Sequence, residues 1–372
     1  MINIGYLLGF FSILAQFKLI IGVPAFLVTL FMLLPKASPR ADLSLVTLYL
    51  SVAIVWMLAI QTLFGSRDLL AVFGALLGPT MLLMSTFLKV SESIIINLFK
   101  ALFALFLVDF LFNISVIIFG VDLFGRGGGL REGDYLQRLG GVVGHPFASV
   151  NFTVVACFAA ILFKNRKMFF LAALGLLING TFRAPLGLVL ILSLLIVLRV
   201  YPRTWVFVLM FPAVAATVVY ATFLTAGDGD FMTGNALRMI AWANAIERIG
   251  DSPIIGFHSF RVGSFETMST DTIIDFGIAE SPVLQLWLDY GFFPPLFMMI
   301  TFITIISKSL NRYRESPNNP FYFTGVAMAA YAFIDFSFGT FLGSITTTIP
   351  MALLCLSYRA NIPERFPLSV RA

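Results

Sequence analysis

Four ionisable residues of this 372-residue chain have side chains that could do chemistry on a substrate. Arg183 opens an apolar stretch, and Arg238 lies in a long, more polar segment. A guanidinium group stays protonated and offers a planar fork of N–H donors that matches phosphate oxygens. Glu280 and His258 carry groups that can accept a proton from a hydroxyl. Their use depends on where the helices of the chain place them.

Metal and nucleotide chemistry is not indicated by the sequence. His145 and His258, the two histidines, are far apart and show no metal-ligand spacing. Cys157 and Cys355 lie in apolar runs without a metal or disulfide pattern. The glycine-rich segment 125–129 is neither a Walker nor a Rossmann loop. We expect no metal and no cofactor, with a cation held by carboxylates as the alternative.

The composition is that of an integral membrane protein. Hydrophobic residues make up 59% of the chain and charged residues only 12%, about half of the ~25% usual in soluble domains. The mean hydropathy is +0.96. These values exclude soluble, disordered and coiled-coil proteins, and the long apolar runs predict an all-α polytopic protein. The net charge of +5 is explained by basic cytoplasmic loops, so no nucleic-acid partner is expected.

About twelve transmembrane helices are predicted, because crossing the ~30 Å hydrocarbon core takes about 20 residues. The apolar stretches are 4–16, 19–34, 45–64, 69–88, 94–119, 149–163, 168–180, 184–198, 204–225, 282–306, 321–336 and 341–358. Several are short, so ten or eleven spans is the alternative. Gly291 with Pro294-Pro295 is expected to break or bend the stretch 282–306.

Charge predicts the orientation of a single membrane domain, residues 1–372, in the bacterial inner membrane. With the N-terminus in the cytoplasm, the short inner loops carry most of the 24 Lys and Arg residues, as the positive-inside rule requires. Both termini are then cytoplasmic. Two long loops, 120–148 and 226–279, lie on the periplasmic side. A protein with its bulk outside is expected to act there.

The larger loop is predicted to contain an interfacial helix over residues 236–249, which include no Gly or Pro. Arg238, Trp242, Ala245 and Ile249 follow at helical spacing and share one face. Trp242 could hold this helix at the headgroup level, where Arg238 would meet lipid phosphate. The alternative is a packed loop helix with a solvated arginine.

Ionisable residues at membrane depth are functional candidates by default. For Asp109 and Asp335 the alternative is a structural hydrogen-bonded or ion-paired site. Arg183 could instead extend its head to the outer lipid headgroups. Glu280 could simply stabilise the start of the helix that follows it, because the N-terminal dipole favours an anion.

Taken together, these residues resemble the O-antigen ligase/polymerase superfamily of bacterial envelopes. The long-loop motif of that family is matched by Arg238, Trp242, Ala245, Pro253, Gly256 and Phe260. Further matches are Glu280-Ser281 leading to Asp289-Tyr290-Gly291, then Phe182-Arg183-Ala184, and Gly144-His145-Pro146 with Asn151. The resemblance covers about residues 138–300. Ligases of the family carry histidine where Glu280 stands, and His258 replaces a glycine. These departures favour a polysaccharide polymerase or a divergent ligase.

The resemblance implies glycosyl transfer at the periplasmic face from a glycan on undecaprenyl diphosphate. The implied pyrophosphate ligands are Arg183 and Arg238, then Arg261 and Arg138. The implied base for the acceptor hydroxyl is Glu280, with His258 second. Arginines would replace a metal ion electrostatically. The expected partners are the lipid-linked oligosaccharide, membrane lipid and a chain-length regulator.

Three other functions stay open. An O-antigen ligase would transfer the glycan to lipid A-core. A lipid-linked oligosaccharide flippase would also use charges at membrane depth, but spread through the spans and on both sides. A peptidoglycan glycosyltransferase shares the lipid-linked donor, although its motifs are not seen. The clustering of polar residues on the outer side favours an outward-facing enzyme.

Overall fold

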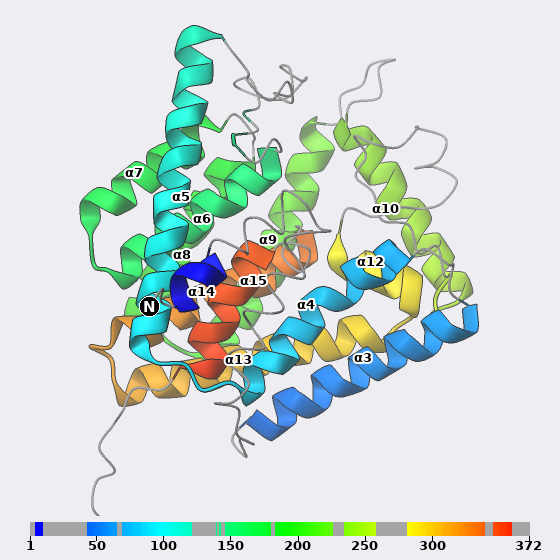
Figure 1. Ribbon diagram of the computed structural model, residues 1–372. Coiled ribbons are helices and arrows are strands. Elements are labelled where there is room, and N and C mark those ends of the chain that lie inside the picture. The colour runs from blue at the N-terminus through cyan, green and yellow to red at the C-terminus, as the bar shows by residue number, and fades with distance from the viewer. Residues whose placement is uncertain are drawn as a thin grey trace, which may run out of the picture.

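The computed structural model describes residues 4–9, 43–64, 69–120, 139, 141–142, 146–179, 183–225, 234–257, 281–338 and 345–358. This part of the chain is mostly helical and has no β-strand (Figure 1). Its helices are α3 (Ser44–Phe64), α4 (Leu69–Phe87), α5 (Glu92–Phe119), α6 (Pro146–Leu162), α7 (Arg166–Ile178), α8 (Arg183–Val200), α9 (Thr204–Thr225), α10 (Gly234–Asp251), α12 (Pro282–Tyr290), α13 (Phe293–Glu315), α14 (Pro320–Phe338), α15 (Ile345–Ala352) and the π-helix η4 (Leu353–Ser357).

The helices follow the predicted apolar stretches closely. α9 has the predicted bounds, and α3 begins one residue before the predicted stretch. Among the described residues α3, α5 and α13 are long and apolar enough to cross a membrane. An all-α membrane protein agrees with this, because only helices satisfy every backbone polar group within their own segment in lipid. The stretch 19–34 lies outside the described residues, so twelve spans stay a prediction.

Lipid-facing stripes are visible on the long helices. On α3 the side chains of Leu48, Val55 and Leu63 are 54%, 65% and 72% exposed. On α5 the same is true of Leu111 and Ile118. Such runs of exposed apolar side chains are costly in water and ordinary in a bilayer. The composition of the chain and the exposed apolar side chains of these helices therefore both indicate a lipid bilayer as the surroundings.

The stretch 282–306 is divided into two helices, and the division falls at Gly291 as predicted. α12 has 9 residues, about 14 Å at ~1.5 Å per residue, which is too short to cross the membrane. α13 has 23 residues and carries prolines in its first turn, where a missing N–H costs nothing. The described helix of this stretch that is long and apolar enough to cross a membrane therefore begins at Phe293, and a span that starts at Pro282 stays a prediction.

One end of the helix bundle gathers the turns with basic residues; we call it the basic end. Lys164 Nζ, after α6, donates to the Asn318 carbonyl between α13 and α14 at 3.4 Å. Arg314 in α13 donates to the Pro202 carbonyl between α8 and α9. The Val90 N–H, between α4 and α5, donates to the Ser357 carbonyl at 3.2 Å. Because successive helices alternate in direction, α10 and the α12–α13 junction lie toward the opposite end (Figure 1).

This arrangement gives a topology prediction. Reporter fusions after Asn165 and Tyr201, both at the basic end, and after Asn361 should report the cytoplasm by the positive-inside rule. Fusions after Gly128 and Asp271 should report the periplasm. A cytoplasmic signal at Asp271 would contradict both the orientation and an outward-facing site.

Candidate functional site

The structure describes the helices that carry two of the predicted site residues. Arg183 is the first residue of α8, and Arg238 lies in α10. Glu280, His258, Arg261 and Arg138 lie outside the described residues. The described part of the candidate site consists of α8, α10, residues 252–257 and α12.

α10 packs one face on α12, through a small apolar cluster. Ala245 and Ile249 are buried against Leu288, and Trp242 and Trp287 pack around them. The predicted shared face of Trp242, Ala245 and Ile249 is thus confirmed. Arg238 lies four residues before Trp242 in the same helix. Packing on α12 agrees with a packed loop helix, and a position of α10 at the membrane interface stays a prediction.

Residues 252–257 are joined to the α12–α13 junction by three hydrogen bonds. Trp287 Nε1 donates to the Pro253 carbonyl at 2.9 Å, and the Phe292 N–H donates to the same carbonyl at 3.0 Å. The Phe257 N–H donates to the Leu288 carbonyl at 2.5 Å. Two motif segments that are separated in sequence therefore form one structural unit. We call α10, residues 252–257 and α12 the α10–α12 unit.

Two glycines allow this close approach. Gly256 and Gly291 have φ of +83° and +79°, a region that side chains with a Cβ rarely adopt. A methyl group at Gly291 would lie 1.9 Å from the Ile254 carbonyl oxygen, and one at Gly256 would lie 2.7 Å from the Gly291 nitrogen. Both glycines belong to the motifs noticed in the sequence, and their role is to let two backbone segments touch.

Gly291→Ala is therefore expected to destabilise the α10–α12 unit by about 1–3 kcal/mol, the usual cost of one strained backbone position. The measurement is the thermal unfolding midpoint in detergent, together with the rate of protease cleavage at residues 252–257. Gly250→Ala is the matched control, because no atom lies within 4 Å of a methyl group there and alanine favours a helix. Equal midpoints for the two variants would contradict the close approach.

α12 begins and ends at well-defined contacts. Ser281 caps its start, because the Ser281 hydroxyl accepts a hydrogen bond from the Leu284 N–H at 3.4 Å. Pro282 is the first residue of the helix. At its end Trp56 Nε1 of α3 donates to the Tyr290 carbonyl at 2.8 Å. Burial and the neighbouring Asp289 carboxylate raise the pKa of Tyr290, so its hydroxyl stays protonated. Glu280 immediately precedes this cap.

Arg183 is the first residue of α8, one turn before Gly187. The buried residues of this helix include Ala184, Ile191, Leu194 and Leu198, and the exposed ones include Val189, Leu192 and Ile196. A role of Arg183 inside the protein, rather than extension of its side chain to the lipid headgroups, stays a prediction.

Helix register brings Arg183 level with Asp335. A methyl group at Gly187 would lie 3.4 Å from the Tyr331 hydroxyl oxygen of α14. α8 ends and α14 begins at the basic end, so the two helices are antiparallel. Counting one turn from Gly187 and from Tyr331, in the direction away from the basic end, residue 183 of α8 and residue 335 of α14 therefore come at the same level. Asp335 is 8% exposed, so its carboxylate is inside the bundle.

Asp109 proves to be a structural anchor. Its carboxylate accepts hydrogen bonds from Ser149 Oγ at 2.6 Å, the Val142 N–H at 2.8 Å and Asn113 Nδ2 at 3.4 Å. Gly141, with φ of +61°, lies so close that a methyl group there would be 1.9 Å from Asp109 Oδ1. The aspartate thus fastens residues 141–142 to α5 and α6, as the structural alternative expected.

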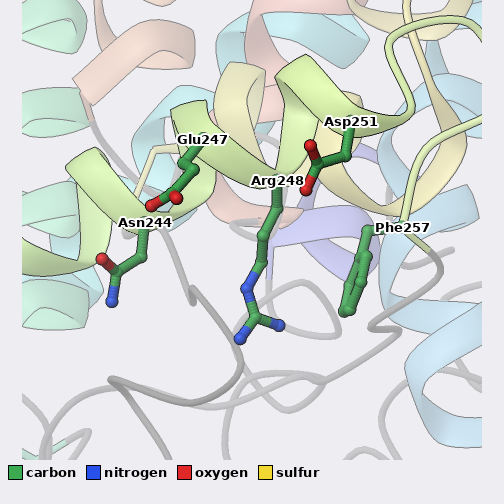
Figure 2. Close-up of a pocket in the computed structure, with 5 residues that line it drawn as sticks. All are labelled: Asn244, Glu247, Arg248, Asp251 and Phe257. Atoms are coloured by element: carbon green, nitrogen blue, oxygen red, sulfur yellow. The ribbon is translucent and has the colours of Figure 1, made fainter.

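A pocket of about 420 Å³ opens beside α10, and the sequence reasoning missed it (Figure 2). It is lined by Asn244, Glu247, Arg248, Asp251 and Phe257. The Arg248 guanidinium carbon lies 4.6 Å from the centre of the Phe257 ring. The four helical residues are spaced as i, i+3, i+4 and i+7, a signal that was present in the sequence.

Among the described residues no group of three or more His, Cys, Asp or Glu side chains is arranged to hold a metal ion.

No protein-family model matches the chain, and no curated protein matches it either. The resemblance to the O-antigen ligase/polymerase superfamily therefore rests on the motif residues alone.

Proposed function

We propose that this protein is a membrane glycosyltransferase that polymerises glycan repeat units carried on undecaprenyl diphosphate, at the periplasmic face of the bacterial inner membrane. The observation that carries the proposal is the α10–α12 unit. It joins the segment of Pro253 and Gly256 to that of Gly291 through paired backbone contacts. The unit lies toward the end of the bundle opposite the basic turns, which the positive-inside rule assigns to the cytoplasm.

The reaction needs two kinds of group. The acceptor hydroxyl attacks the anomeric carbon of the donor, the bond from that carbon to the pyrophosphate oxygen breaks, and the hydroxyl proton passes to a base. Glu280 is the proposed base, and His258 is the second candidate. Direct displacement of this kind inverts the anomeric configuration.

The departing pyrophosphate gains negative charge, which the arginines would stabilise. Arg183 and Arg238 are the proposed ligands, with Arg261 and Arg138 in support. The register of residue 183 on α8 with residue 335 on the neighbouring α14 supports this role, because a carboxylate behind a guanidinium can hold its fork in one orientation. Asp335 is thus proposed as a positioning residue for Arg183.

Deletion followed by gel analysis of the cell-envelope polysaccharide tests the proposal. A polymerase deletion abolishes the ladder and leaves one repeat unit attached to its acceptor. Loss of all capped core, with lipid-linked polymer accumulating, would instead identify a ligase. A normal ladder would contradict both. Complementation with the wild-type chain must restore the ladder.

A further inference from the structure

The pocket beside α10 is formed on a different side of the helix from the face that covers α12. Asn244, Glu247, Arg248 and Asp251 line one side of the pocket, and Phe257 lies across from Arg248 (Figure 2). Ala241, Ala245 and Ile249 are buried on another side of α10. Glu247 and Asp251 are exposed on the side of the pocket while α10 stays packed on α12.

The aromatic wall of the pocket is held in place by the backbone. The Phe257 N–H donates to the Leu288 carbonyl, and the left-handed turn at Gly256 fixes the direction of the chain. Arg248 lies against the ring at 4.6 Å, a cation–π contact. The Phe257 side chain nevertheless stays 43% exposed, so ring area is free for a ligand.

The chemistry of the lining suits hydroxyl groups better than phosphate. Two carboxylates accept hydrogen bonds, the guanidinium donates them, and the amide of Asn244 does both. A sugar hydroxyl can donate a hydrogen bond to a carboxylate and accept one from the guanidinium. With two carboxylates and one guanidinium the formal charge of the lining is −1, which repels a pyrophosphate. The volume of about 420 Å³ falls within the ~300–1,000 Å³ range of small-ligand pockets.

We propose that this pocket is a glycan-binding subsite, in which Phe257 stacks on the C–H face of a sugar ring and the α10 side chains bind its hydroxyls. The inference rests on the proposed function, since it assigns the sugar part of the lipid-linked substrate to a place separate from the arginines that bind pyrophosphate. Residue 257 directly precedes His258, the second candidate base, in the chain.

The test is saturation-transfer NMR on the full-length protein in detergent, with a panel of neutral hexose and N-acetylhexosamine oligosaccharides as probes. Wild-type protein should transfer saturation to ring protons of at least one oligosaccharide. Phe257→Ala should lower the apparent affinity by about fivefold or more, the loss of roughly one aromatic contact. Asp251→Asn should weaken binding too, whereas Phe257→Trp should retain it.

Phe119→Ala is the matched control, because Phe119 is an exposed aromatic side chain, 73% accessible, on α5. It should bind like wild type. Transfer to no oligosaccharide, equal transfer in Phe257→Ala, or full displacement by inorganic pyrophosphate would overturn the subsite; the last outcome would identify a phosphate site. Sugar binding is measured without turnover, so failure here is distinct from an unchanged polysaccharide ladder on deletion, which would contradict the proposed function.

Discussion

Arg183→Ala is expected to reduce polymer formation by roughly 10²–10³-fold or more, the usual cost of removing one charge-stabilising donor, so that the ladder disappears from a gel. Residue 183 is one turn from Gly187 on α8 and level with Asp335 on α14. Lysine keeps the charge but loses the two-pronged fork, so Arg183→Lys should give short, weak ladders. Arg238→Ala and Arg238→Lys should behave in the same way.

Arg199→Ala is the matched control for Arg183, because Arg199 is an exposed arginine in the last turn of the same helix. It should leave the ladder unchanged. The level of each variant in the membrane must be equal, since a folding defect would also remove polymer. A fully active Arg183→Ala variant at normal level would show that the arginine has no part in catalysis.

The positioning role of Asp335 is tested by combining variants. Asp335→Asn alone should lower the rate and raise the KM for the lipid-linked donor, because the Arg183 fork loses its support. Added to Arg183→Ala, the same change should cost little more, since residues that act together are not additive. Independent, additive losses would mean that Asp335 acts elsewhere.

The helices were predictable from sequence because the membrane leaves so few choices. An apolar run of about 20 residues in lipid must be helical to satisfy its backbone, and α3 and α9 follow their predicted stretches almost residue for residue. The break at Gly291 was predictable for a local reason too, as glycine and nearby prolines interrupt a helix. The consequence of the break, a separate 9-residue helix α12 packed on α10, depends on long-range contacts.

The site was less predictable, since its contacts join distant parts of the chain. The partners of Asp109 come from residues 142 and 149, and no local pattern indicates that it is an anchor. The same holds for Gly291, whose fit against Ile254 explains the glycine better than helix breaking alone. A role for Arg248 could not be predicted from the sequence, because its contact with Phe257 reaches across a turn.

Glu280→Gln is expected to lower the rate of polymerisation by roughly 10²–10⁴-fold, the usual contribution of general-base catalysis, while donor binding survives. Glutamine keeps the size and hydrogen bonding of the side chain but cannot accept the proton of the acceptor hydroxyl. The measurement is turnover of purified protein with a lipid-linked donor. Glu315→Gln, at the far end of α13, is a carboxylate control and should be fully active.

The outcome also decides between two explanations of Glu280. Ser281 caps α12 and Pro282 follows it, so an acid at position 280 could serve only the helix dipole, worth about 0.3–1 kcal/mol. That role predicts a small loss of stability and almost no loss of rate in Glu280→Gln. Catalysis predicts a large loss of rate and little loss of stability. It further predicts that Glu280→His keeps part of the rate with a changed pH optimum, because the imidazolium ion is a weaker acid than a carboxylic acid. If Glu280→Gln is nearly as active as wild type, His258 becomes the residue to replace.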